Sequence, residues 1–180
     1  MINKLGLFLL SGMAVLLQTG CTGGRQEMVM SLNSSNPQLV WEVKPQADLE
    51  KATGEQISLP GFDMSGSVKG VVPGTVFTAY VEAGAVPDPD YADNIYKVDE
   101  TFYNRPFWYR MEFELPDFYS EGRRVWLHFD NTNRFADFYF NGEKISGTKT
   151  SVKDVSGHMI RSKFDVTRRS ALPVRMRSPC

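Results

Sequence analysis

Apolar and polar residues alternate along the middle of the chain, as they do in strands that are buried on one side. The alternation covers residues 107–115, where every odd-numbered residue is apolar, and it resumes over residues 125–130 and 134–140. The last of these runs ends at Asn141-Gly142, a pair that readily adopts the positive φ angles of a type I′ hairpin turn. These patterns predict an antiparallel meander, in which residues 131–133 turn the chain between its second and third strands.

Shorter patterns predict further elements on both sides of this meander. Residues 39–43 and 70–76 are expected to form strands, with Pro45 ending the first, and the apolar spacing over 75–83 favours a short helix. A last strand is expected over 157–166. The chain is therefore predicted to be all-β.

Two segments between these elements are expected to be irregular. Residues 53–67 are rich in Gly and Pro and are predicted to be loop, with at most a short strand at 57–59. Residues 85–94 form a long acidic and aromatic loop just before the meander. Long loops on a β framework are where binding residues usually lie.

The two faces of the strands carry different expectations. The polar residues of the 107–115 run are expected to face water; they are Arg110, Glu112 and Glu114. The tryptophans lie within alternating strands and are expected in the core rather than as platforms for sugar rings; they are Trp41, Trp108 and Trp126.

Composition and charge exclude several classes of function. The chain has 180 residues, of which 42% are hydrophobic and 12% aromatic, enough for the core of one domain. Its formal net charge of -1 leaves no excess of Lys and Arg to attract nucleic acid or an anionic membrane surface. The two cysteines, Cys21 and Cys180, lie near opposite ends and give neither a disulfide framework nor zinc-site spacing. We therefore expect no nucleic acid partner and no metal or other cofactor.

The N-terminus has the pattern of an export signal. Lys4 supplies a positive start, residues 5–17 form an apolar run too short to span a bilayer comfortably, and Thr19-Gly20-Cys21 places small residues before a cysteine. This ending resembles the lipobox of bacterial lipoproteins, although Gln18 stands where leucine is usual. The alternatives are an ordinary cleaved signal or a buried apolar helix. We expect a lipoprotein signal over residues 1–20, with Cys21 lipidated and the protein anchored in the bacterial cell envelope, facing the periplasm or the exterior.

Some polar residues invite a catalytic interpretation that their setting does not support. Glu112 and Glu114 share one face of a strand at roughly 7 Å, but a solvated outer face explains both. An acid/base pair would need a pocket that separates the two pKa values. His128 and His158 have no third partner and no metal-ligand spacing, so we interpret them as surface or packing residues.

The loop over residues 85–94 is the best candidate for a binding site. Carboxylate and amide side chains hold sugar hydroxyls, and an aromatic ring covers the apolar face of a sugar. The loop offers both kinds of group, in Asp88, Tyr91, Asp93 and Asn94. A calcium site at its three aspartates is the weaker interpretation, because the glycine and terminal glutamate of an EF-hand loop are missing. Turn formation alone also accounts for Asp and Asn here.

Seven short motifs follow one another in a fixed order along the chain. They are Val72-Pro73-Gly74-Thr75-Val76, the 84–94 loop with its Pro87-Asp88-Pro89, Phe107-Trp108-Tyr109-Arg110, Leu127-His128-Phe129-Asp130, Ala136-Asp137, Asn141-Gly142 and Phe164-Asp165-Val166-Thr167. Together they resemble the N-terminal sugar-binding domain of glycoside hydrolase family 2, in its β-mannosidase and exo-β-glucosaminidase branch. The resemblance implies a jelly-roll β-sandwich of the galactose-binding-like type, in agreement with the all-β pattern.

The resemblance also implies a role without catalysis. In such enzymes this domain precedes an immunoglobulin-like sandwich and a (β/α)₈ barrel that supplies both catalytic glutamates. We therefore expect no catalytic residue in this chain. Asn104 matches the position where family members place an asparagine near the substrate.

The same likeness predicts the organisation of the chain. After the signal, residues 21–37 are expected to be a flexible tether and residues 38–167 the sugar-binding jelly roll. Residues 168–180 are expected to be an unrelated basic tail. The sandwich would then be incomplete at its C-terminal end, as in a truncated or frameshifted reading frame.

Three hypotheses follow for function. The first is an accessory domain of an exported exo-acting β-glycosidase, which shapes the rim of a pocket for a β-linked glycan. The second is a free-standing carbohydrate-binding lipoprotein of the envelope. The third is an inert fragment whose exposed strand edges promote aggregation.

Overall fold

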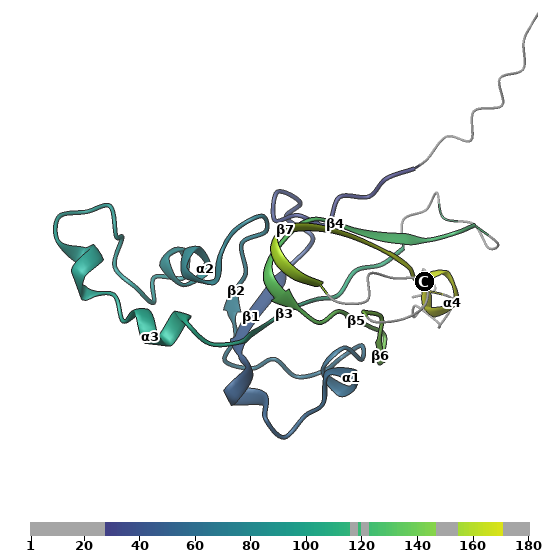
Figure 1. The fold of residues 1–180 in the computed structure, drawn as a ribbon, viewed down its shortest axis with the longest axis horizontal. Coiled ribbons are helices and arrows are strands. Elements are labelled where there is room, and N and C mark those ends of the chain that lie inside the picture. The colour runs from purple at the N-terminus through teal and green to yellow at the C-terminus, as the bar shows by residue number, and fades with distance from the viewer. Residues whose placement is uncertain (1–27, 116–118, 120–122, 147–154, 171–180) are drawn as a thin grey trace, which may run out of the picture.

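The computed structural model describes residues 28–115, 119, 123–146 and 155–170, which form short helices and three antiparallel sheets (Figure 1). The strands are β1 (Trp41–Pro45), β2 (Val68–Lys69), β3 (Phe107–Met111), β4 (Trp126–Ala136), β5 (Tyr139–Phe140), β6 (Glu143–Lys144) and β7 (Val155–Asp165). The helical turns are η1 (Gln46–Leu49), α1 (Gly54–Ile57), α2 (Val76–Glu82), η2 (Asn94–Lys97), α3 (Glu100–Tyr103) and α4 (Thr167–Ser170). The expected signal and Cys21 lie outside the described residues.

The first sheet has the order β2-β1-β3. Its central strand β1 places Val43 opposite Tyr109 of β3 and opposite Val68 of β2. Leu39 and Val43 are buried, so the predicted inward face of this strand is confirmed. The strand also ends at the predicted residue, because Pro45, the register partner of Phe107, is its last member.

The second sheet pairs β4 with β7, and it corrects the predicted meander. Residues 131–133 do not turn the chain; they lie within β4, where two register shifts flank Thr132. Such bulges bend and twist a strand without ending it. The predicted pairing of β3 with β4 is also wrong, since β3 pairs with β1 and β4 with β7. Alternation in a sequence determines which face of a strand is buried but does not determine its pairing partner.

The tight turn after β5 is as predicted. Asn141 has a φ of 47° and Gly142 a φ of 86°, and together they close the hairpin of β5 and β6. The backbone N–H of Gly142 donates a 3.0 Å hydrogen bond to Oγ of Ser58, which ties this hairpin to the α1 segment.

Outside the meander, some of the predicted elements are confirmed and others are wrong. The helix expected over 75–83 is α2, capped by Thr75, whose Oγ1 accepts a 3.1 Å hydrogen bond from the N–H of Thr78. The last expected strand is β7. The strand expected at 57–59 is wrong, because a capping box of Thr53 and Gln56 starts helix α1 instead. The strand expected at 70–76 is also wrong, since the pairing with β1 falls earlier, at β2.

Each half of the chain has its own group of buried apolar side chains. In the second half, Ile145, Phe164 and Val166 form the core, and the rings of Phe129 and Phe138 pack on it. The buried apolar residues of the first half are Leu39, Val43, Ile57, Met64 and Ala79.

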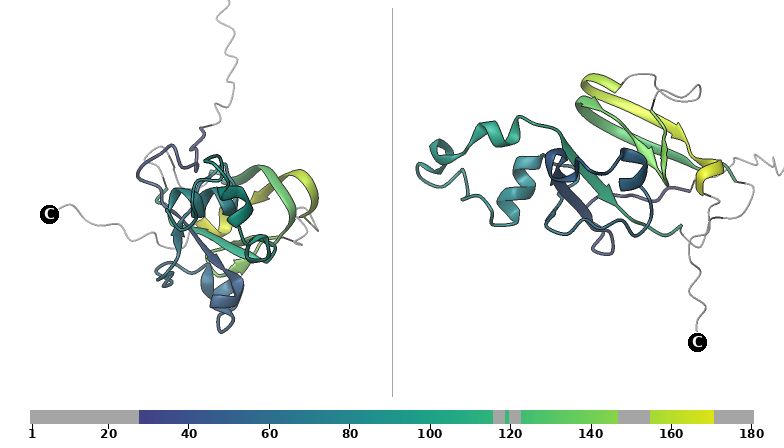
Figure 2. Two further views of the ribbon diagram at one scale, coloured as in Figure 1. Left: turned by 90° about the vertical axis from the view of Figure 1, so that its left-hand side faces the viewer. Right: turned by 90° about the horizontal axis from the view of Figure 1, so that it is seen from below.

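A few contacts join the halves, and the β4–β7 sheet faces the β1–β3 sheet across them (Figure 2). Trp108 packs on Tyr139 with ring centroids 5.5 Å apart, and Phe113 lies 6.4 Å from Phe140. Trp126 is not at this interface: it is 38% exposed, with Nζ of Lys163 4.5 Å from its ring centroid. The expectation of a core position is therefore wrong for Trp126, whereas Trp41 and Trp108 are half-buried.

Candidate functional site

Residues 76–104, called the arm here, extend away from the sheets and carry the candidate binding residues (Figure 1, Figure 2). Ring contacts at the base of the arm hold α2, α3 and β3 together. The ring of Tyr80 lies 5.2 Å from Phe102, 5.8 Å from Tyr103 and 6.1 Å from Phe107, all edge to face. Edge-to-face pairs of this kind are each worth about 0.5–1.5 kcal/mol beyond the area they bury. The aromatic base therefore gives the arm a defined direction.

The structure brings four of the five predicted site residues together, at the end of the arm. The side-chain amide of Asn94 donates a 2.9 Å hydrogen bond to the backbone carbonyl of Asp88, which closes the loop. The carboxylate of Asp93 forms an ion pair with Nζ of Lys97 at 2.8 Å. Tyr91 lies between Asp88 and Asp93 in the chain and is 73% exposed. We call residues 88–97 the arm tip.

The arm tip can bind through its surface but cannot enclose a ligand. Asp93 is exposed and its ion pair with Lys97 lies in solvent, where such pairs contribute about 0–1 kcal/mol. The ring of Tyr91 offers an apolar face, and Asp88 and Asn94 offer acceptors and donors for hydroxyl groups.

Sequence reasoning missed two exposed apolar residues of the arm tip. Tyr96 is 89% exposed and Ile95 is 51% exposed, and both lie in η2, which follows Tyr91 in the chain. No alternation marks this one-turn helix, so the pattern alone could not show that its side chains face solvent. The local composition, aromatic residues among Asp and Asn, was the available signal.

Asn104 lies apart from the arm tip. It ends α3, where its N–H donates a 3.1 Å hydrogen bond to the carbonyl of Glu100, and the chain then enters β3. No hydrogen bond or ring contact found among the described residues joins Asn104 to residues 88–94. The predicted site is therefore divided between the tip and the base of the arm.

Arg110 corrects the expectation of a solvated polar face on β3. Its side chain is only 8% exposed, and its guanidinium donates 2.9 Å hydrogen bonds to the carbonyls of Ile57 and Leu59. It also pairs with Glu42 at 3.3 Å and, at shorter range, with Glu112. Arg110 therefore fastens the α1 segment to the first sheet.

Glu112 belongs to this cluster rather than to an acid/base pair. Burial raises the pKa of its carboxyl, but hydrogen bonds from Arg110 and from the N–H of Gly61 outweigh that effect and lower the pKa overall. Both glutamates are exposed, as predicted, and Glu112 also pairs with Arg110. His128 is exposed on β4, and His158 lies in β7.

The lowered pKa predicts that stability falls in acid. A folded-state pKa below the unfolded value contributes stability above the unfolded pKa, near 4.3, and this contribution is lost as pH falls through the folded value. We expect the difference in unfolding free energy between the wild-type chain and Glu112→Gln to shrink as pH drops below about 4.3. Denaturant titrations at several pH values measure it, and Glu114→Gln is the matched control. A difference that stays constant with pH would contradict the ion pair.

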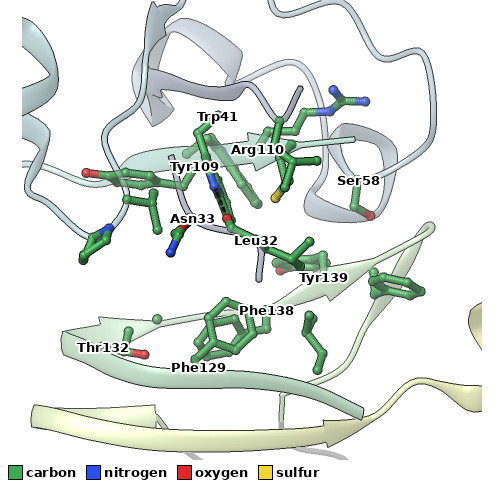
Figure 3. Close-up of a pocket in the computed structure, with 18 of the residues that line it drawn as sticks. Leu32, Asn33, Trp41, Ser58, Tyr109, Arg110, Phe129, Thr132, Phe138 and Tyr139 are labelled. Carbon is green, nitrogen blue, oxygen red and sulfur yellow. Dashed lines mark hydrogen bonds between the residues drawn. The ribbon is translucent and has the colours of Figure 1, made fainter. Parts of the chain in front are cut away.

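An open space lies between the two sheets (Figure 3). It measures about 5160 Å³ and opens to solvent, whereas ligand pockets usually enclose about 300–1,000 Å³, so it does not form a pocket fitted to one sugar. Tyr109, Phe129 and Phe138 line it. Burial raises the pKa of Tyr109 to about 12.

Other kinds of site are not found in the part of the chain that the structure describes. There, no group of three or more His, Cys, Asp or Glu side chains is arranged to hold a metal ion. No helix within the same residues is long and apolar enough to cross a membrane.

The facing sheets with a projecting arm define a galactose-binding-like β domain. Residues 41–178 match the family described as glycosyl hydrolase 2 galactose-binding domain-like, and the chain belongs to this family. The crystal structure of an exo-chitosanase from Amycolatopsis orientalis superposes with a TM-score of 0.61 at 27% identity, over 72% of this chain. The same enzyme has been solved in complex with PNP-β-D-glucosamine. The predicted all-β, galactose-binding-like fold is thus confirmed.

Two relatives are similar in sequence, and both are exo-β-D-glucosaminidases. The enzyme of Streptomyces avermitilis is 32% identical over 111 residues, and that of Amycolatopsis orientalis is 30% identical over 123 residues. These alignments cover 62% and 68% of this chain but only 12% and 11% of the relatives. The chain therefore corresponds to a small part of each enzyme.

Proposed function

We propose that this chain is the accessory N-terminal domain of an exported exo-β-glucosaminidase and contributes the arm to the rim of its substrate pocket. The observation that carries the proposal is the family match together with an arm that presents Tyr91, Asp93 and Asn94 away from the sheets. The preferred ligand is a β-linked glucosamine oligosaccharide, since both relatives act as exo-β-D-glucosaminidases. Catalysis belongs to a barrel outside these residues.

In this role, the arm positions a substrate rather than transforming it. Tyr91 covers one apolar face of a sugar ring, while Asp88 and Asn94 bind its hydroxyls. Asn104 acts separately, at the base of the arm, on the part of the glycan nearest to the catalytic partner. The aromatic contacts of Tyr80 with Phe102 and Phe107 hold the base of the arm together.

We expect the purified chain to contact glucosamine oligosaccharides weakly through the arm and to hydrolyse none of them. In a heteronuclear NMR titration with chitobiose at millimolar concentration, the amides of residues 88–94 and 104 should shift. Tyr91→Ala should abolish the shifts of residues 88–94 because it removes the stacking ring. Phe135→Ala, which removes an aromatic ring that is 82% exposed on β4, is the control and should leave them intact.

Turnover of a nitrophenyl β-glucosaminide by the chain alone would contradict this role. Shifts confined to the β4–β7 sheet would show that the arm is not the contact surface.

A free-standing carbohydrate-binding lipoprotein is the second candidate function. The exposed aromatic residues Tyr91 and Tyr96 favour it, because surface binding modules use such rings as platforms. Calorimetry separates the two candidates. An independent module should bind β-linked oligosaccharides with a dissociation constant below about 1 mM, or about −4.1 kcal/mol, whereas a rim domain should release no measurable heat.

We also propose that Cys21 carries a lipid that anchors the protein in the cell envelope. The support is the apolar run over residues 5–17 followed by Thr19-Gly20-Cys21. Cells expressing the chain should incorporate labelled palmitate into it, and Cys21→Ser should abolish the label. The second cysteine gives a matched control, because Cys180→Ser should retain full labelling. Equal labelling of both variants would contradict a lipoprotein signal.

A further inference from the structure

The chain contains one Asn-Gly pair, and the structure holds this pair against the α1 segment. Asn141 and Gly142 form the turn between β5 and β6, with φ angles of 47° and 86°, and both residues are half-buried. Gly142 lies so close to Leu59 that a Cβ in its place would come within 2.9 Å of Cδ2 of that side chain. The backbone of the turn is therefore covered by a segment that is distant in the sequence.

One side chain, Ser58, binds the nitrogen of Gly142. The hydroxyl of Ser58 donates a 3.1 Å hydrogen bond to the carbonyl of Glu55 and accepts a 3.0 Å hydrogen bond from the N–H of Gly142. A hydroxyl has one proton to donate, and here it is used within the α1 segment, which leaves the lone pairs of Oγ to accept from Gly142. Ser58 is half-buried, so this hydrogen bond is partly shielded from water.

The same nitrogen is the nucleophile in the deamidation of asparagine. After losing its proton to a base in solution, the nitrogen of Gly142 attacks Cγ of Asn141. The bond from Cγ to the side-chain nitrogen breaks, and that nitrogen leaves as ammonia. Water then opens the resulting cyclic imide at either of its two carbonyls, which gives aspartate or isoaspartate. A following glycine favours ring closure because it has no Cβ to hinder the approach.

The folded turn opposes this reaction. The φ angles of Asn141 and Gly142 are those of a type I′ turn, in which the nitrogen of the second residue points away from the side chain of the first. Ring closure therefore needs a rotation about the Cα–C bond of Asn141. That rotation breaks the hydrogen bond from Gly142 to Ser58, and the contact with Leu59 hinders the accompanying movement of Gly142.

We propose that Asn141 is a site of spontaneous deamidation that reacts when the α1 segment locally releases the turn, and that the hydroxyl of Ser58 restrains this release. Isoaspartate adds a methylene group to the backbone of the turn, which then cannot keep the geometry that joins β5 to β6. The modification therefore weakens a contact between the two halves of the chain.

Mass spectrometry of the full chain, incubated in a mildly alkaline buffer, measures the rate of deamidation at Asn141. The folded wild-type chain should react at least about tenfold more slowly than the chain unfolded in urea, because it must first open locally. Ser58→Ala should raise the folded rate about fivefold, the factor that corresponds to one hydrogen bond of about 1 kcal/mol. Ser58→Thr keeps the hydroxyl and should react at the wild-type rate. Ser65→Ala is the matched control, because it removes an exposed hydroxyl that bonds to Asp63 in its own loop, and it should also react at the wild-type rate.

Equal rates for the folded and the unfolded wild-type chain would overturn the proposal, as would a Ser58→Ala chain that reacts no faster than the wild type or than Ser65→Ala. If Ser58→Ala does not fold, the wild-type chain decides the matter through its rate at low urea concentrations. A rate that rises more gently with urea than global unfolding does supports a local release of the turn. A rate with the full urea dependence of global unfolding would show that the α1 segment does not release the turn by itself, and would overturn the proposal.

Discussion

Arg110→Met should destabilise the chain by about 3 kcal/mol, because it removes a buried guanidinium that donates hydrogen bonds to two carbonyls and pairs with two partly exposed carboxylates. The carbonyls of Ile57 and Leu59 lose their donor, and the carboxylates of Glu42 and Glu112 lose their counter-ion. Methionine fills a similar volume, so the loss measures the polar contacts rather than a cavity. Chemical denaturation followed by tryptophan fluorescence gives the difference in unfolding free energy.

Two further variants separate charge from geometry. Arg110→Lys keeps the positive charge, but one ammonium group cannot reach two carbonyls and two carboxylates at once, so we expect it to recover less than half of the loss. Arg161→Met is the matched control, because Arg161 also lies on a strand but is exposed, and it should change stability by less than about 0.5 kcal/mol. A similar loss for Arg110→Met and Arg161→Met would show that the buried guanidinium does not fasten α1 to the sheet.

Arg110 also illustrates what alternation can and cannot predict. The period of the 107–115 run placed Arg110 on the polar face, but Arg110 is the buried residue of β3 and its neighbours in the strand are half-buried. Whether a polar residue meets water depends on what covers it, and here residues 57–59, at and after the end of α1, cover Arg110 with the carbonyls of Ile57 and Leu59. That cover comes from residues 51 to 53 positions earlier in the chain, which no local pattern contains.

The strand partners were unpredictable for a related reason. Residues 125–136 have two alternating runs separated by Asn131, Thr132 and Asn133, residues that favour turns. The structure keeps them in one strand because β7 pairs along both runs and bulges absorb the interruption. By contrast, the Asn141-Gly142 turn was predictable, since it depends on the φ angles of two adjacent residues.

In the candidate site, too, the local features were predictable and the contacts between distant residues were not. Asp88, Tyr91, Asp93 and Asn94 came together because they lie within one loop of the sequence, so local composition was sufficient. The separation of Asn104 from them depends on the length and direction of the arm, which ring contacts between α2, α3 and β3 determine. The sequence contains those rings but does not show which of them meet.

Gly54→Ala should destabilise the chain by about 2 kcal/mol, although alanine is the better helix former by about 1 kcal/mol. Gly54 begins α1, and a Cβ at this position would overlap the ring of Tyr139, with only 2.7 Å to Cε2. The ring cannot move aside freely, because it packs on Trp108 and has Lys144 above it at 5.8 Å. Thermal unfolding of the variant, analysed together with Tyr139→Leu, measures the effect.

The double variant shows whether this contact joins the two halves of the domain. If Gly54 lies against Tyr139 as described, Gly54→Ala should cost at least about 0.5 kcal/mol less in the Tyr139→Leu background than in the wild-type chain. Independent effects of the two substitutions, or a more stable Gly54→Ala variant, would mean that α1 does not pack on β5. Since Ser58, directly after α1, also accepts a hydrogen bond from the turn at Gly142, such a result would weaken one of the links between the α1 segment and the second half of the chain.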